Sequence, residues 1–306
     1  MNAVMMVAGL AMLLVGGEGL VRGAVAFATR MRLPMAVVGA VVLGFGTSMP
    51  EMLTSLSAAL AGAPGIAIGN VLGSNIANIA LILGVAAMIA AIPADTAGFE
   101  DRLWLIVATV MGIAVILIGA NIGRIEGAIL LGALAIYLWR ALSRDAANEP
   151  VPEIPDMGLG VMAAYLLAGL GTLIAGAWLL VAGATGIARG LGVSETMIGL
   201  TIVAIGTSLP ELATSVIAAR RGEAGLALGN ILGSNVFNIL AILGLTAVIV
   251  PIPVPSDLSL VDLALVAGTA ALLLVALATG RIGRGMGFLF LAVYAGYTGW
   301  LVLNAA

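Results

Sequence analysis

The sequence contains no cysteine, no histidine and no lysine, and charged residues make up only 9% of its 306 positions. These absences exclude disulfide frameworks, thiolate or imidazole metal sites, and catalysis by cysteine or histidine. All 12 basic residues are arginines, too few and too dispersed for a nucleic-acid interface. Because soluble domains carry about 25% charged residues, this composition excludes a soluble globular domain.

What the sequence does contain is apolar residues, at 62% of positions, with a mean hydropathy of +1.22. A membrane-crossing helix needs about 20 mostly apolar residues. Ten such segments can be read between charged residues and Pro/Gly breaks, at 4–28, 35–61, 66–91, 103–120, 126–142, 158–188, 196–219, 225–250, 261–279 and 286–304. The sequence therefore predicts an all-α membrane protein of ten transmembrane helices.

The distribution of arginine predicts the orientation of these spans. Ten of the 12 arginines lie at the end of the first span or in connections that follow odd-numbered spans, and only Arg124 and Arg189 lie on the other side. Because arginine-rich connections remain in the cytoplasm, we expect a multi-pass protein of the cell inner (plasma) membrane with both termini outside. The Pro-rich, charged stretch 143–156 is then a cytoplasmic linker.

An internal repeat divides the chain into two halves. A shift of 160 places lays residues 39–84 on 199–244, and 24 of these 46 positions are identical. The repeats are predicted at 1–142 and 157–306, with five spans each. An odd number of spans gives the halves opposite orientations in the membrane, as in many secondary transporters. A duplicated structural scaffold would explain the repeated apolar positions but not the repeated polar ones.

Two polar segments lie inside the second and seventh spans, GTSMPE at 46–51 and GTSLPE at 206–211. Proline removes a helical hydrogen bond, and broken backbone within a membrane requires protein or a polar cavity around it. Thr47 and Glu51 are four residues apart and share a helix face. A carboxylate at mid-membrane costs about 2.5–3.5 kcal/mol. Neither glutamate has an arginine within a helical turn, which favours a bound cation.

The third and eighth spans carry the second polar set, Asn70, Ser74, Asn75 and Asn78, repeated as Asn230, Ser234, Asn235 and Asn238. Ser74 and Asn78 lie four apart on one face, as do their counterparts. Asn75 and Asn235 point elsewhere and are interpreted as contacts between helices. Close approach of helices is expected at the small residues Gly69, Gly73, Gly229 and Gly233.

These residues offer carboxylate, hydroxyl, amide and backbone oxygens, with no imidazole or thiolate. Such a set suits hard cations such as Ca²⁺, which takes six to eight oxygens, whereas softer metals prefer nitrogen or sulfur ligands. One divalent or two monovalent cations would neutralise Glu51 and Glu211. Competition of different cations for the same two charges is the physical basis of exchange.

The paired motifs, GTS-x-PE and GN-x-x-GSN-x-x-N, resemble the alpha-repeats of the prokaryotic sodium/calcium exchangers in the cation/calcium antiporter superfamily. The proton/calcium branch lacks the GTS-x-PE wording. The resemblance spans essentially the whole chain and implies two inverted five-helix repeats, with helices 2, 3, 7 and 8 broken. It implies Ca²⁺ and Na⁺ as transported substrates, with no cofactor, no enzymatic activity and no obligate protein partner beside the lipid bilayer.

Carried over by motif, the resemblance implies a set of ion ligands. Glu51 and Glu211 would be shared by Ca²⁺ and Na⁺, with Asn78 and Asn238 beside them. Further Na⁺ ligands would be Thr47, Ser48, Thr207, Ser208, Ser74, Ser234 and the carbonyls of Gly44 and Ala204. One departure concerns Asn238, where well-known prokaryotic relatives carry Asp. The site then holds two formal negative charges, although the three-sodium-for-one-calcium coupling of the family is still expected.

Two other functions remain open from the residues alone. A proton-coupled cation exchanger would have to use the same two glutamates, and a cation channel would use the acidic pair as a filter, although it is not a ring. Outside the motifs, Glu18 and Arg22 lie four residues apart in the first span and have no counterparts at Trp178 and Ala182. We interpret them as a local ion pair.

Overall fold

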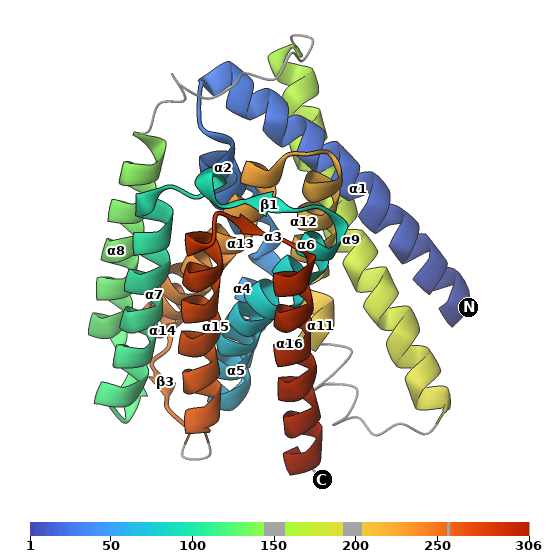
Figure 1. The fold of residues 1–306 in the computed structure, drawn as a ribbon. Coiled ribbons are helices and arrows are strands. Elements are labelled where there is room, and N and C mark those ends of the chain that lie inside the picture. Colours follow the sequence, from blue (N-terminus) through green and yellow to red (C-terminus); the bar gives the residue numbers. More distant parts are fainter. Residues whose placement is uncertain (144–156, 192–203, 256–257, 306) are drawn as a thin grey trace.

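The computed structural model describes residues 1–143, 157–191, 204–255 and 258–305 (Figure 1). The first half contains α1 (Asn2–Met31), α2 (Met35–Val38), the π-helix η1 (Gly39–Leu43), α3 (Gly44–Thr47), α4 (Met49–Leu60), α5 (Pro64–Ile76), the π-helix η2 (Ala77–Leu83), α6 (Gly84–Ile89), β1 (Ile92–Pro93), the 3-10 helix η3 (Ala94–Thr96), α7 (Phe99–Ile118), β2 (Asn121–Ile122) and α8 (Arg124–Leu142). The second contains α9 (Leu159–Gly190), α11 (Ala204–Thr207), α12 (Leu209–Arg220), α13 (Ala224–Phe237), the π-helix η5 (Asn238–Leu243), α14 (Gly244–Ile249), β3 (Ile252–Pro253), α15 (Leu260–Ala278), β4 (Arg281–Ile282) and α16 (Arg284–Ala305).

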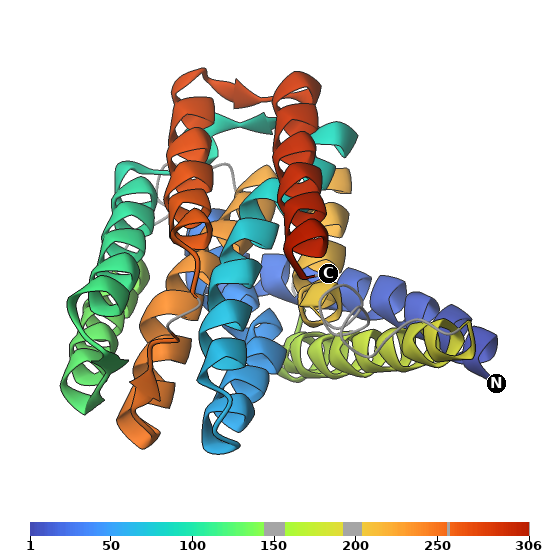
Figure 2. The same ribbon diagram turned by 90° about the horizontal axis from the view of Figure 1, so that it is seen from below.

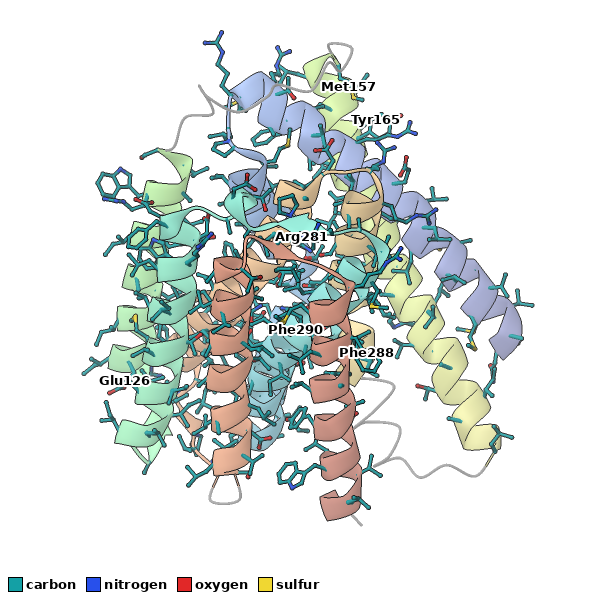
Figure 3. All side chains as sticks on the ribbon, viewed as in Figure 1. Glu126, Met157, Tyr165, Arg281, Phe288 and Phe290 are labelled. Atoms are coloured by element: carbon teal, nitrogen blue, oxygen red, sulfur yellow. The ribbon has the colours of Figure 1, made fainter. Side chains whose placement is uncertain are left out.

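Helices of membrane-spanning length dominate the chain. Within the described residues, eight helices are long and apolar enough to cross a membrane, and the bent pair Met35–Thr47 and Met49–Leu60 makes up to nine. The predicted seventh span begins outside the described residues. Of the predicted linker 143–156, only Ser143 is described. On α16, Phe290 is fully buried, whereas Phe288 is 69% exposed and faces the surroundings (Figure 3). The structure is that of an all-α membrane protein.

The second span bends within its polar segment. Its two parts, α3 and α4, meet at Ser48 and the helices on either side are inclined by 44°. Pro50 lies in the first turn of α4, where its missing N–H has no helical partner to lose. The second repeat copies this start, because α12 begins at Leu209 with Pro210 in its first turn. Glu51 and Glu211 thereby fall in the first turns of two helices.

The third and eighth spans run through the membrane without such a bend. Residues Pro64–Ile89 and Ala224–Ile249 each form one continuous helical segment, although the sequence predicted broken helices there. Each contains instead a π-helical stretch, η2 and η5, near its middle. A π-helix carries i→i+5 hydrogen bonds and occurs mostly at functional sites. Asn78 lies in η2 and Asn238 begins η5.

Two short antiparallel ladders join the halves. β1 pairs with β4, and β2 pairs with β3, toward opposite ends of the molecule (Figure 1). The 160-residue shift lays β1 on β3 and β2 on β4, so the two ladders are equivalent. Because α7 runs from β1 to β2 and α15 runs from β3 to β4, these matching helices cross the molecule in opposite directions.

α1 and α9 form a pair that extends from one side of the other helices (Figure 2). Glycines bring their backbones together. A Cβ at Gly16 would lie 2.7 Å from the backbone nitrogen of Leu173, and one at Gly169 would lie 2.6 Å from that of Leu20. The pair therefore has a backbone-to-backbone contact that no larger residue would allow.

The close approach predicted at glycines of the eighth span is confirmed. A Cβ at Gly229 or Gly233 would lie 2.2 or 2.3 Å from the carbonyl oxygen of Ala36 or Ala40, respectively. At Gly69 and Gly73 nothing in the described part of the chain lies within 4 Å of such a Cβ. The segment that the repeat would place there begins at 196, outside the described residues. α13 is thus pressed against α2 and η1 across the two halves.

Candidate cation-binding site

Glu51 and Glu211 are both buried, with 1% of each residue exposed, and each accepts a hydrogen bond from a serine of the opposite repeat. The hydroxyl of Ser48 donates to Oε1 of Glu211 over 3.0 Å, and that of Ser208 donates to Oε1 of Glu51 over 3.1 Å. Each serine directly precedes the helix that carries its own repeat's glutamate. The two broken segments therefore face each other, and each carboxylate is supported by the opposite half.

Four buried side-chain oxygens at this centre have no hydrogen-bond partner among the residues that the structure describes: Oε2 of Glu51, Oε2 of Glu211, Oδ1 of Asn78 and Oδ1 of Asn238. They form two pairs related by the internal repeat. Leaving a polar group buried without a partner costs at least 1–3 kcal/mol in proteins, as a rough figure, and far more for a charge. A cation within reach of these oxygens would supply the partner that each of them lacks.

The remaining predicted ligands lie around this centre, as far as they are described. Thr47 is fully buried, and its hydroxyl donates to the carbonyl of Leu43 over 2.9 Å. The hydroxyl of Ser234 donates to the carbonyl of Gly44 over 3.5 Å, which brings these two predicted ligands together. Ser74 is buried at the α5 position that matches Ser234.

The second-repeat counterparts of Thr47 and Gly44 are described less fully. Thr207 is partly buried and ends α11, directly before Ser208. Ala204 begins α11, and its side chain lies outside the described residues. Ten of the twelve predicted ligands are thus buried, namely Gly44, Thr47, Ser48, Glu51, Ser74, Asn78, Ser208, Glu211, Ser234 and Asn238.

Asn70 and Asn230 donate hydrogen bonds to the backbone carbonyls of the glutamates. The predicted ligand set did not include this supporting role. The side-chain amide of Asn70 donates to the carbonyl of Glu51 over 3.1 Å and to the hydroxyl of Ser55 over 2.9 Å. Asn230 makes the matching contacts with Glu211, over 3.5 Å, and with Ser215, over 2.9 Å. The signal in the sequence was the recurrence of these asparagines and serines in both repeats.

Asn75 and Asn235 differ from each other, although both were interpreted as contacts between helices. Asn75 does connect helices, because its amide nitrogen donates to the carbonyl of Asn235 over 3.3 Å. Its oxygen also accepts from the amide nitrogen of Asn238 over 3.0 Å, so it touches a predicted ligand. Asn235 instead donates to the carbonyl of Ile231 in its own helix, over 2.7 Å.

The ion pair predicted between Glu18 and Arg22 is present, with Nε of Arg22 donating to Glu18 over 3.0 Å. Glu18 also accepts hydrogen bonds from Arg221, the residue that follows α12. This second contact joins the first span to the second repeat. Helical spacing could not have predicted it, because the partners are 203 residues apart.

The chemistry of the central site suits a cation and offers little to other ligands. Its donors are carboxylate, amide, hydroxyl and carbonyl oxygens, which is the set preferred by hard cations. In the described part of the chain no cluster of three or more acidic, histidine or cysteine residues exists. The formal charge of the site therefore comes from one carboxylate pair.

A helical membrane protein with a buried, oxygen-lined candidate cation site between two matching halves is the class that these observations define. The chain belongs to the sodium/calcium exchanger protein family, whose profile matches residues 1–143 and 161–303. It is 29% identical to the sodium/calcium exchanger MaX1 of Methanosarcina acetivorans, with 97% of each chain covered. It is 34% identical to the inner membrane protein YrbG of Escherichia coli, covering 81% of this chain and 79% of that protein.

The fold is also that of a solved exchanger. The structure of the sodium-calcium exchanger NCX_Mj in zero Na⁺ and Ca²⁺ superimposes with a TM-score of 0.84 at 34% identity. The match covers 100% of this chain and 98% of that one. A second structure of the same exchanger, soaked in 10 mM Na⁺ and 10 mM Sr²⁺, also gives a TM-score of 0.84. The resemblance inferred from the motifs is thereby confirmed at the level of family and fold.

Proposed function

We propose that this protein is a sodium/calcium antiporter that uses the inward Na⁺ gradient to move Ca²⁺ out of the cell. Ca²⁺ and Na⁺ would occupy the site between Glu51 and Glu211 in turn. Each ion would reach it from one side of the membrane at a time. The observation that carries the proposal is the set of four buried, unpartnered oxygens from Glu51, Glu211, Asn78 and Asn238.

Competition for one pair of charges is the reason for exchange rather than free passage. Two carboxylates are neutralised by one Ca²⁺ or by two Na⁺, so full occupancy by one ion displaces the other. Burial supports the same conclusion, because Glu51 and Glu211 are only 1% exposed. A pair of carboxylates buried in this way suits a carrier better than the ring of charges that lines a channel.

The architecture that we propose for this cycle is two inverted five-helix repeats, 1–142 and 157–306, with the cytoplasmic linker 143–156 between them. Both termini would face outward. Thr207 and the carbonyl of Ala204 would complete the sodium ligands on the second repeat. α1 and α9 would move as one unit over the helices that hold the site. Their glycine-mediated contact supports this, because it couples them more closely to each other than to the rest.

The test is Ca²⁺ uptake by purified protein in Na⁺-loaded vesicles diluted into Na⁺-free buffer. We expect uptake that depends on the outward Na⁺ gradient and disappears when Na⁺ is equal on both sides. Vesicles with a pH gradient and no Na⁺ serve as the comparison for proton coupling. Uptake that ignores Na⁺ but follows the pH gradient would overturn the sodium-driven mechanism in favour of proton-coupled exchange.

A further inference from the structure

The four central asparagines break the symmetry of the repeat. Asn78 matches Asn238 and Asn75 matches Asn235, and all four are buried. Asn238 donates to Asn75, whereas Asn235, the counterpart of Asn75, turns its amide nitrogen back to Ile231 in its own helix. The two halves of the site therefore hold their amide ligands in different ways.

The direction of this chain of hydrogen bonds is determined at one end. The backbone carbonyl of Asn235 can only accept, so the group of Asn75 that faces it at 3.3 Å must be the amide nitrogen. The oxygen of Asn75 is then left to face Asn238 at 3.0 Å, and the atom it meets must be the amide nitrogen of Asn238. Oδ1 of Asn238 is thereby left buried without a partner.

We infer that Asn75 is a positioning residue: it orients the Asn238 amide so that Oδ1 faces the cation, and it favours an amide over a carboxylate at position 238. This rests on the proposed function. A carboxylate has no N–H, so at position 238 it would set oxygen against the oxygen of Asn75. It could keep the contact only as a protonated acid, or by turning Asn75 and breaking its bond to Asn235.

The consequence is a site whose charge is held at two. The hydrogen-bond chain from the Asn235 carbonyl through Asn75 accepts a neutral donor at position 238, so Glu51 and Glu211 remain the carboxylates of the centre. On the other half, Asn78 has the same unpartnered oxygen, and among the described residues it has no such constraint. Within the described part of the chain, selection of the amide is therefore a property of the second-repeat ligand.

The first test compares Asn75→Ala with Asn235→Ala in vesicles, measuring the Ca²⁺ concentration for half-maximal uptake. Asn235→Ala is the matched control, since it removes the equivalent side chain but keeps the backbone carbonyl that Asn75 uses. We expect a rise of about five- to tenfold for Asn75→Ala, the equivalent of one hydrogen bond, with maximal rate nearly unchanged. Asn235→Ala should stay within about twofold. Equal shifts in both variants would overturn the inference.

The second test uses Asn238→Asp with and without Asn75→Ala. With Asn75 present, uptake by Asn238→Asp should fall steeply as pH rises, because only the protonated acid can donate to Asn75. Adding Asn75→Ala should remove this pH dependence. Asn75→Ala should therefore weaken uptake when residue 238 is Asn and improve uptake when residue 238 is Asp. Equal losses in both backgrounds would indicate a merely structural role and would overturn the inference.

Ca²⁺-dependent thermal stabilisation of the same variants separates this inference from the proposed function. Wild-type protein that binds Ca²⁺ but shows no Na⁺-driven uptake would contradict the proposed function alone. The comparison of Asn75→Ala with Asn235→Ala would then be read from the Ca²⁺ concentration needed for stabilisation. Unfolding temperatures without Ca²⁺ identify any variant that has lost its fold.

Discussion

The two halves of the molecule agree around the two glutamates and differ at the edge. Around Glu51 and Glu211, the bond from Ser48 to the opposite carboxylate and the bond from Asn70 to Ser55 each have a counterpart in the second repeat at a similar distance. At the edge, Glu18 joins Arg221, while the matching positions hold Trp178 and Ala61. Symmetry is therefore kept around the two carboxylates, and lost at the central asparagines and where the halves meet the surroundings.

This difference has a mechanical meaning. A carrier with inverted repeats passes between two states in which the halves exchange roles, so a symmetric centre offers the ion similar ligands in both. Contacts present on one side only add energy to one state and not to its mirror image. Under the proposed function, the symmetric residues would set how tightly ions bind, and the asymmetric ones would set which state is more populated.

The strongest test of the symmetric centre is to replace each glutamate in turn. We expect Glu51→Gln and Glu211→Gln to reduce Ca²⁺ uptake by about two to three orders of magnitude, because losing one partner of a buried charge pair costs about 3–5 kcal/mol. The losses should be similar, since both carboxylates are buried to 1% exposure and bonded to an opposing serine. Near-normal uptake by either variant would remove that glutamate from the site.

Adding or removing the cation should have the next largest effect. Ca²⁺ at about 100 times its dissociation constant would stabilise the folded protein by about 2.7 kcal/mol, which corresponds to a rise of roughly 5 °C or more in unfolding temperature. Chelation should reverse it, since Oε2 of Glu51 and Oε2 of Glu211 lose their partner. Tryptophan fluorescence during heating measures the change. A calcium response that survives in Glu51→Gln/Glu211→Gln would place the ion elsewhere.

The serine pair tests whether the halves contribute equally. Ser48→Ala and Ser208→Ala each remove a hydroxyl that donates to the opposite glutamate, at 3.0 and 3.1 Å. Hydrogen bonds to charged groups contribute about 1.5–3 kcal/mol, so we expect the affinity for Ca²⁺ to fall at least about tenfold in either variant. Ser55→Ala is a control, because Ser55 contacts Asn70 rather than a carboxylate. A large difference between Ser48→Ala and Ser208→Ala would contradict the equivalence.

The sequence predicted the membrane class and the polar centre, because both leave strong local signals. Twenty-residue apolar runs identify spans, and a carboxylate such as Glu51 is too costly in hydrocarbon to occur twice at the same repeat position without a role. The form of the third and eighth spans was not predictable in this way. A π-helical stretch such as η2 contains no proline that would mark it in the sequence, and its formation depends on packing against other helices.

Contacts between distant residues were also beyond the sequence. Asn75 and Asn235 are identical in type and repeat position, yet only Asn75 touches a predicted ligand. The difference depends on which carbonyl each amide meets, and this is set by how the two halves pack. The Glu18–Arg221 contact likewise requires that α1 lie beside the end of α12.

That contact is the site of the smallest predicted effect and the sharpest test of the asymmetric edge. Both side chains are more than one-third exposed, at 39% for Glu18 and 34% for Arg221. An exposed ion pair contributes about 0–1 kcal/mol, so Arg221→Ala should change the ratio of the two transport states by at most about fivefold. The affinity of Arg221→Ala for Ca²⁺ should change less than that of Ser48→Ala or Ser208→Ala.

The natural absence of cysteine makes this shift measurable. A single cysteine at Gly65, an exposed position at the start of α5 where a Cβ would touch only Pro255, can be labelled from one side without background, and its labelling rate should change in Arg221→Ala. The exchanged pair Glu18→Arg/Arg221→Glu should restore the original rate, although Arg22 beside position 18 will weaken the restored pair. Because the contact exists on one side only, the shift should favour one state. An unchanged rate in Arg221→Ala would mean that Glu18 and Arg221 hold α1 in place equally in both states, and the asymmetry of the edge would have no effect on the cycle.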